Sequence, residues 1–174
     1  MNQRANFKLK PNGKLPIHMD WKGAFQKFNV VGGPFDHFVD FDDEHKNAFG
    51  VCVRAEYPPE NDVHLAIKDF DVPKEYDLPK VKSAIRQTLK ALLDGKNVYV
   101  GCMGGWGRTG LFMALLAKVT EQHADPIQYV RTLYTPKAVE TKPQQNYVSD
   151  FDVRELRAWF RRECWKKRLS FWRR

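Results

Sequence analysis

The chain has 174 residues, of which 43% are hydrophobic, 29% charged and 13% aromatic, a length and composition typical of one compact globular domain. No apolar run approaches the roughly 20 residues that span a bilayer, and the polar N-terminus has no apolar signal core, which argues against a membrane or secreted protein. The net charge of +8 favours anionic ligands, such as phosphorylated protein, nucleic acid or an acidic membrane face.

The three cysteines, Cys52, Cys102 and Cys164, are too few and odd in number for a disulfide framework. They indicate a reducing compartment, so we expect a cytoplasmic protein in which a thiol can perform chemistry. For Cys52 and Cys164 we expect only the role of core or surface thiols.

The first half of the chain predicts short strands. Residues 1–20 contain Pro11-Asn12-Gly13 and Pro16 and are expected to form an irregular leader. A β-rich segment at 21–31 is followed by Gly32-Gly33-Pro34, which indicates a turn. Two further short strands are expected at about 49–53 and 63–67, because apolar and β-branched residues cluster there.

The second half predicts helices around one buried strand. Apolar residues at helical spacing predict a helix at 79–93, and a short apolar run predicts a strand at 97–100. Further helices are expected at 111–119, at 126–133 after the Asp-Pro start at Asp125, and from about 143 into the tail. Strands alternating with helices predict an α/β fold with a central, mostly parallel sheet flanked by helices.

We expect one domain over residues 1–174 that ends in a basic helix or tail at about 151–174. That tail holds nine Lys/Arg against three Asp/Glu, with aromatic residues between them. Such a segment suits docking on an acidic partner, a nucleic acid or an anionic membrane, although most such helices are simply solvated.

The segment between the strand at 97–100 and the next helix carries the chemistry. Cys102 and Arg108 are separated by five residues, and Gly104, Gly105 and Gly107 are three of them. Glycines allow the backbone to curl so that successive N–H groups point at one anion, and the helix start adds its dipole. Arg108 supplies a planar fork for two phosphate oxygens. A cysteine at the base of this loop is expected to ionise to a nucleophilic thiolate, with Thr109 donating a hydrogen bond to the sulfur.

The segment from Cys102 to Gly110 resembles the signature of the protein tyrosine phosphatase superfamily, in particular its small dual-specificity branch. Two more segments agree in order and spacing. Residues 64–73 are similar to the mobile loop that carries the general acid in that family. Residues 138–144 resemble its Val-Glu-Thr-x-x-Gln stretch. The resemblance covers about half of the chain, from His64 to Val148, and implies a cysteine-based phosphatase fold.

The resemblance implies a two-step reaction in which Cys102 attacks phosphorus and an aspartate protonates the leaving oxygen. Asp69 is the preferred general acid, because the neighbouring Phe and Val-Pro then stay in register with the family pattern, and Asp71 is the alternative. Gln144 is a further candidate, for orienting the hydrolytic water, with helix capping or plain solvent exposure as the alternatives. No metal or other cofactor is expected, because loop amides and Arg108 carry the charge stabilisation.

The substrate-binding residues implied by the resemblance are those of the loop itself, Met103, Gly104, Gly105, Trp106 and Gly107, together with Arg108. The loop lacks the two lysines of lipid-phosphatase relatives, which counts against phosphoinositides. The residue before the cysteine is Gly101 where the family usually has His, a difference expected to leave Cys102 less acidic or the loop looser and so to weaken catalysis.

Three functions follow as hypotheses. The leading one is a protein phosphatase that acts on phosphotyrosine and also on phosphoserine or phosphothreonine. The second is a phospho-binding pseudophosphatase with little turnover, and Gly101 is the feature that supports it. The third is an RNA or nucleotide 5′-phosphatase, suggested by the basic tail with its interleaved aromatic residues.

Overall fold

The computed structural model describes residues 14–21, 24–58, 60–120 and 124–172, with side chains described from residue 29 to residue 169. A five-stranded sheet runs through the molecule in the order β1-β2-β5-β3-β4. The strands are β1 (Lys14–Trp21), β2 (Ala24–Pro34), β3 (Ala48–Cys52), β4 (Val63–His64) and β5 (Asn97–Cys102). Only β1 pairs antiparallel with its neighbour, so the predicted α/β fold with a mostly parallel sheet is confirmed.

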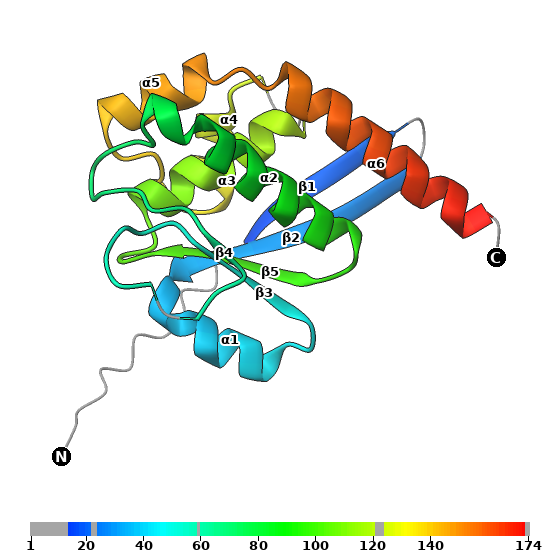
Figure 1. The fold of residues 1–174 in the computed structure, drawn as a ribbon, viewed down its shortest axis with the longest axis horizontal. Helices are drawn as coiled ribbons and strands as arrows, with labels where there is room; N and C mark the ends of the chain where they lie inside the picture. The colour runs from blue at the N-terminus through cyan, green and yellow to red at the C-terminus, as the bar shows by residue number, and fades with distance from the viewer. Residues whose placement is uncertain (1–13, 22–23, 59, 121–123, 173–174) are drawn as a thin grey trace.

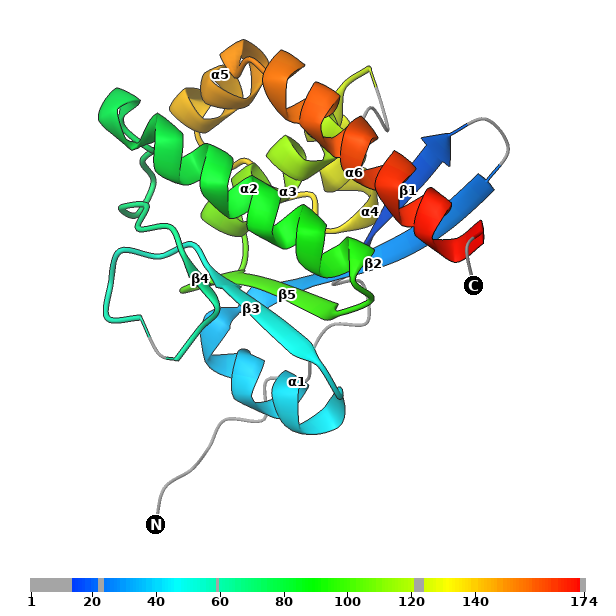
Figure 2. The ribbon, with the colours of Figure 1, turned by 45° about the vertical axis from the view of Figure 1, so that its right-hand side comes forward.

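Helices cover the two faces of this sheet unequally (Figures 1 and 2). A 3₁₀ turn at Phe35–His37 and the short helix α1 (Phe38–Glu44) lie on one face. The other face carries the remaining helices, namely α2 (Leu78–Leu93), α3 (Gly107–Val119), α4 (Pro126–Leu133), α5 (Lys142–Asp150) and α6 (Arg154–Trp172). A 3₁₀ turn at Glu75–Asp77 leads into α2.

The core explains why β5 and α3 are fixed in place. Val98 and Val100 of β5 are fully buried, and nearly every residue of α3 is buried as well.

The ends of the outer helices are capped locally. The Asp125 carboxylate accepts hydrogen bonds from the N–H groups of Ile127 and Gln128, both at 3.0 Å, which starts α4 as the sequence predicts.

Two predictions for the N-terminal half are wrong. Residues 14–20 belong to β1, because they pair along their whole length with β2, and the rest of the expected leader lies outside the described residues. Gly32 and Gly33 are part of β2 and pair with Val100 and Gly101 of β5. They are glycines because neighbours approach closely. A Cβ on Gly32 would lie 2.4 Å from Cε of Met113, and one on Gly33 would lie 2.5 Å from the Tyr99 hydroxyl.

Two further elements differ from their predicted lengths. The strand expected at 63–67 is regular only at Val63–His64. The last helix is interrupted, because Phe151 is extended (ψ 116°) and both Phe151 and Val153 turn into the core, at 6% and 5% exposure. Asp152 between them accepts the N–H of Arg154 at 3.0 Å and so restarts the chain as α6.

None of the helices in the described ranges is both long and apolar enough to cross a membrane.

Candidate active site

The loop between β5 and α3 lies at the ends of three parallel strands. Cys102 is the last residue of β5, is 3% exposed, and accepts a hydrogen bond at its Sγ from the N–H of Gly105 at 3.3 Å. Ligands of open parallel sheets bind at this edge, beyond the carboxyl ends of the strands. The geometry therefore places a buried thiol at the base of a loop that leads into the N-terminus of α3.

Gly105 is required by the path of this loop. Its φ is +76°, a conformation that L side chains rarely adopt. A Cβ there would also lie 2.5 Å from the carbonyl carbon of Gly33. Gly104, in contrast, has open space around the position of a Cβ. The loop is thus packed against the end of β2 at Gly105 and has free space at Gly104.

Arg108 is the second buried group of the site, at 2% exposure. Its Nη1 donates to both carboxylate oxygens of Glu56, at 2.9 and 2.7 Å, and to the carbonyl of Ile67 at 3.0 Å. Its Nη2 forms an ion pair with Oδ1 of Asp69 at 2.9 Å. Burial alone would lower the pKa of Arg108, but the hydrogen bond to Glu56 and the electrostatic interactions with Cys102, Glu56 and Asp69 raise it.

Glu56 is a site residue that the sequence reasoning missed. Burial opposes its ionisation, but the hydrogen bond from Arg108 and the nearby positive charges lower its pKa below the ordinary value. Arg54, only 5% exposed, holds the segment in place through the Asp36 carboxylate at 2.8 Å and the Tyr57 carbonyl at 3.1 Å. The one available signal was position, since Glu56 closely follows β3 at the same sheet edge.

The two candidate acids have different surroundings. Asp69 is paired with Arg108 and its carboxylate is 57% exposed. Asp71 has other partners, because its Oδ1 accepts the N–H of Val72 at 2.9 Å and its Oδ2 contacts Nζ of Lys74 at 2.7 Å. The hydrogen bond from Lys74 lowers the pKa of Asp71. Of the two aspartates, Asp69 contacts the arginine of the loop and Asp71 is tied into its own turn.

Gln144 holds the segment that carries these aspartates. It is fully buried and forms a reciprocal capping box with Thr141 at the start of α5. Its Nε2 donates to the carbonyl of Asp71 at 3.3 Å, and the Thr141 hydroxyl donates to the carbonyl of Phe70 at 3.2 Å. The side-chain oxygen of Gln144 would lie 3.1 Å from a Cβ on Gly107. Gln144 thus holds the segment of Asp69 and Asp71 and also lies beside the start of α3.

Thr109 does not form the contact expected of it. Its hydroxyl is buried and, within the described part of the chain, has no hydrogen-bond partner. The predicted donation to Cys102 is therefore wrong for this structure, in which the sulfur instead takes the N–H of Gly105.

Gly101 is explained by packing. A Cβ at this position would lie 2.7 Å from Cα of Phe35, 2.8 Å from the carbonyl oxygen of Gly33 and 2.8 Å from N of Phe35. All three are backbone atoms, so a histidine has no room unless the end of β2 moves. Gly101, which precedes Cys102, is thus enclosed on this side, and the expected effect of its missing side chain on catalysis stays a prediction.

The rim of the loop carries exposed apolar side chains next to the site residues. Met103 and Trp106 of the loop are 49% and 44% exposed, Phe70 beside Asp69 is 59% exposed, and Tyr57 is 89% exposed. Nζ of Lys137 lies 3.9 Å from the centre of the Trp106 ring, a cation–π contact. The buried Cys102 and Arg108 are thus bordered by exposed apolar side chains, and Lys137 lies at the edge of this surface.

The other two cysteines are described by their packing. Cys52 belongs to the small cluster under α1, with Phe35, Phe41 and Tyr99, whereas Cys102 belongs to the main core on the opposite face. Burial raises the pKa of both Cys52 and Cys164, the latter to about 11. Both fit the core or surface role expected of them.

Comparisons with known proteins give relatives by sequence and by fold. No protein-family model matches the sequence. Two uncharacterized proteins of Methanocaldococcus jannaschii are each 33% identical to the chain. MJECL20 matches over 106 residues, which are 60% of this chain and 69% of that protein. MJ0215 matches over 150 residues, which are 83% of this chain and 88% of that protein.

The solved structures with this fold include phosphatases. Tk-PTP in its active form has a TM-score of 0.59 at 22% identity, over 80% of this chain and 97% of that one. Kinase associated phosphatase gives 0.59 at 17% identity, over 87% and 98%. DUSP15 gives 0.60 at 14% identity, over 76% and 90%. The chain therefore belongs to the family of the two Methanocaldococcus proteins and has the dual-specificity phosphatase fold of the protein tyrosine phosphatase superfamily.

Proposed function

We propose that the protein is a cysteine-dependent phosphatase that hydrolyses phosphate monoesters of proteins, on tyrosine and also on serine or threonine. The observation that carries this proposal is the joint placement of two buried groups. The Cys102 thiol and the Arg108 guanidinium lie in one glycine-rich loop at the N-terminus of α3, and the Asp69 carboxylate contacts that arginine. A nucleophile, an anion-binding fork and an acid are the three parts that metal-independent phosphate transfer needs.

The first step transfers the phosphoryl group to sulfur. Sγ of Cys102 bonds to phosphorus, the bond from phosphorus to the ester oxygen breaks, and Asp69 gives its proton to that oxygen. In the second step water attacks the thiophosphate, Asp69 takes a proton from the water, and inorganic phosphate leaves with the thiolate restored. Arg108 and the loop N–H groups stabilise the charge of the transferred group in both steps.

Binding of the substrate would rearrange one contact. Nη2 of Arg108 is occupied by Asp69 in this structure, whereas Nη1 is held by Glu56 and Ile67. A phosphate oxygen can replace the Asp69 carboxylate at Nη2 while Glu56 and the Ile67 carbonyl still hold the guanidinium at Nη1. The displaced carboxylate is then available to the leaving oxygen, and its 57% exposure leaves it room to move.

The rim supports a peptide substrate. The exposed side chains of Tyr57, Phe70, Met103 and Trp106 can cover the aromatic ring of phosphotyrosine or the apolar stem of a shorter side chain. The three cysteines of the chain suit the cytoplasm, the compartment in which we expect this reaction.

The test compares wild type with Cys102→Ser on p-nitrophenyl phosphate, phosphotyrosine and phosphoserine peptides, and triphosphorylated RNA. We expect turnover of the aryl phosphate and of at least the phosphotyrosine peptide, unchanged by a chelator and abolished in Cys102→Ser. Peptide binding without turnover by wild type would instead identify a pseudophosphatase, and turnover of the RNA alone would identify a 5′-phosphatase. Hydrolysis that survives Cys102→Ser would overturn the mechanism.

A further inference from the structure

The side chain of Tyr134 reaches the phosphate loop from the end of α4. It is 7% exposed, and its hydroxyl donates a hydrogen bond to the carbonyl of Gly105. The ring is enclosed by β2, since a Cβ on Gly32 would lie 3.0 Å from each of two ring atoms. Packing therefore fixes the ring, and the ring fixes the hydroxyl against one carbonyl of the loop.

The carbonyl of Gly105 belongs to a peptide unit whose orientation matters for anion binding. In a trans peptide the C=O of one residue and the N–H of the next point in opposite directions. Because the Gly105 carbonyl is turned to Tyr134, the N–H of Trp106 is turned away from Tyr134. The N–H of Gly105 itself points to Sγ of Cys102, at 3.3 Å. The N–H groups of Gly105 and Trp106 lie on either side of the left-handed Cα of Gly105 (φ +76°). The Cys102 sulfur thus orients the first of these N–H groups and Tyr134 orients the second.

We propose that Tyr134 is a positioning residue, which keeps the N–H of Trp106 directed toward the phosphate-binding side of the loop. This inference rests on the proposed function. The loop needs such a restraint because Gly104, Gly105 and Gly107 permit backbone conformations that other residues exclude. A peptide rotated by half a turn would present a carbonyl oxygen to the phosphate where a donor is required, and the Gly105 carbonyl would lose its buried partner.

The hydroxyl is suited to a constant structural role. Burial is the main cause that raises the pKa of Tyr134, with smaller electrostatic contributions from the neighbouring Tyr99 and Cys102, so the O–H remains a donor at neutral pH. The neighbouring segment also packs on this part of the chain. Lys137 lies over the Trp106 ring, and a Cβ on Gly110 would lie 2.5 Å from Cβ of Ala138.

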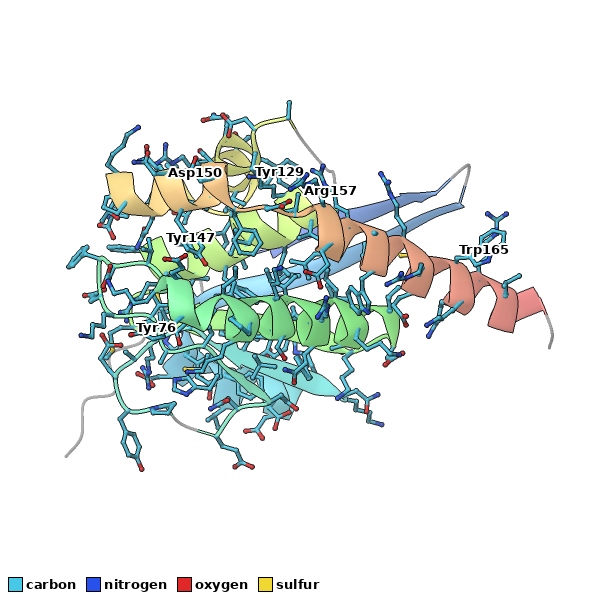
Figure 3. The ribbon with its side chains drawn as sticks, turned by 45° about the horizontal axis from the view of Figure 1, so that its top comes forward. Tyr76, Tyr129, Tyr147, Asp150, Arg157 and Trp165 are labelled. Atoms are coloured by element: carbon cyan, nitrogen blue, oxygen red, sulfur yellow. The ribbon has the colours of Figure 1, made fainter. Side chains whose placement is uncertain are left out.

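The test removes the hydroxyl and keeps the ring, with Tyr134→Phe. Tyr147→Phe is the matched control, a partly buried tyrosine on α5 (Figure 3). Tungstate affinity reports the loop without requiring turnover, and the backbone amide resonance of Trp106 reports the peptide directly. Loss of one oxyanion donor lowers kcat by about 10²–10³. For a donor that is misdirected only part of the time we expect tungstate affinity and kcat/KM to fall by roughly tenfold or more.

The expected pattern is specific to Tyr134→Phe. The tungstate-induced shift of the Trp106 amide should be smaller in Tyr134→Phe than in wild type, whereas Tyr147→Phe should match wild type. Melting temperatures show that both variants are folded at the assay temperature. Tungstate affinity and a Trp106 shift within twofold of wild type in Tyr134→Phe would overturn the proposal. If wild type binds tungstate but turns over no substrate, the proposed function fails and the affinity comparison still decides the role of Tyr134. If wild type binds no tungstate, both are wrong.

Discussion

Replacing Gly101 by alanine is the most direct test of how the loop is held. The added methyl carbon would lie 2.7 Å from Cα of Phe35 and 2.8 Å from the carbonyl oxygen of Gly33. The position is locked from both sides, because Gly101 pairs with Gly33 of β2 and with Cys52 of β3. Overpacking a core typically costs about 1–3 kcal/mol. Since the atoms in the way are backbone, we expect the upper part of that range, about 2–3 kcal/mol.

That cost is measurable by thermal unfolding. In a chain of this size 1 kcal/mol lowers Tm by about 2–4 °C, so Gly101→Ala should melt about 4–12 °C below wild type. Gly104→Ala is the matched control for stability, because a Cβ there meets nothing within 4 Å, and it should melt close to wild type. Equal melting temperatures for Gly101→Ala and Gly104→Ala would refute the close-packing explanation of Gly101.

Three more outcomes are expected. Glu56→Gln should lower Tm at pH 7 by roughly 2–8 °C, from about 1–2 kcal/mol for a half-exposed charge-assisted hydrogen bond. Folding lowers the pKa of Glu56 below 4.5. The stability that the ionised Glu56 contributes is therefore complete above pH 4.5 and is lost as the pH falls through the pKa of Glu56 in the folded protein. The difference in Tm between wild type and Glu56→Gln should thus be smaller at about pH 3 than at about pH 7. Asp69→Asn should slow phosphopeptide hydrolysis about a hundredfold, slow hydrolysis of an activated aryl phosphate less, and flatten the acid-dependent limb of the pH–rate profile. The same pattern in Asp71→Asn instead of Asp69→Asn would identify Asp71 as the general acid. Replacing the exposed Arg162 and Lys166 by serine should weaken salt-sensitive binding to anionic vesicles without changing aryl phosphate turnover. Vesicle binding equal to that of wild type would show that these turns of α6, which extend past the end of α2 (Figures 1 and 2), do not dock on an anionic surface.

Local signals in the sequence were sufficient for the elements that make the site. The apolar run at 97–100, the glycine-rich spacing from Cys102 to Arg108 and the apolar stretch after it predict a strand, an anion-binding loop and a buried helix, and β5 and α3 lie there. These features are readable because each depends on residues within a few positions of one another. The cap at Asp125 is local in the same sense.

Other features were decided by contacts between distant segments. Residues 14–21 are a strand because β2 pairs with them, and the helix break at 151–153 follows from burial of Phe151 and Val153 in a core built by other helices. Glu56 reaches Arg108 across 52 residues of sequence, and Tyr134 reaches Gly105 across 29. The sequence by itself predicted Cys102 as nucleophile and Arg108 as anion-binding group, because they lie six positions apart in one glycine-rich segment. Only the tertiary structure decided what holds them, because side chains meet at a sheet edge according to strand order rather than sequence distance.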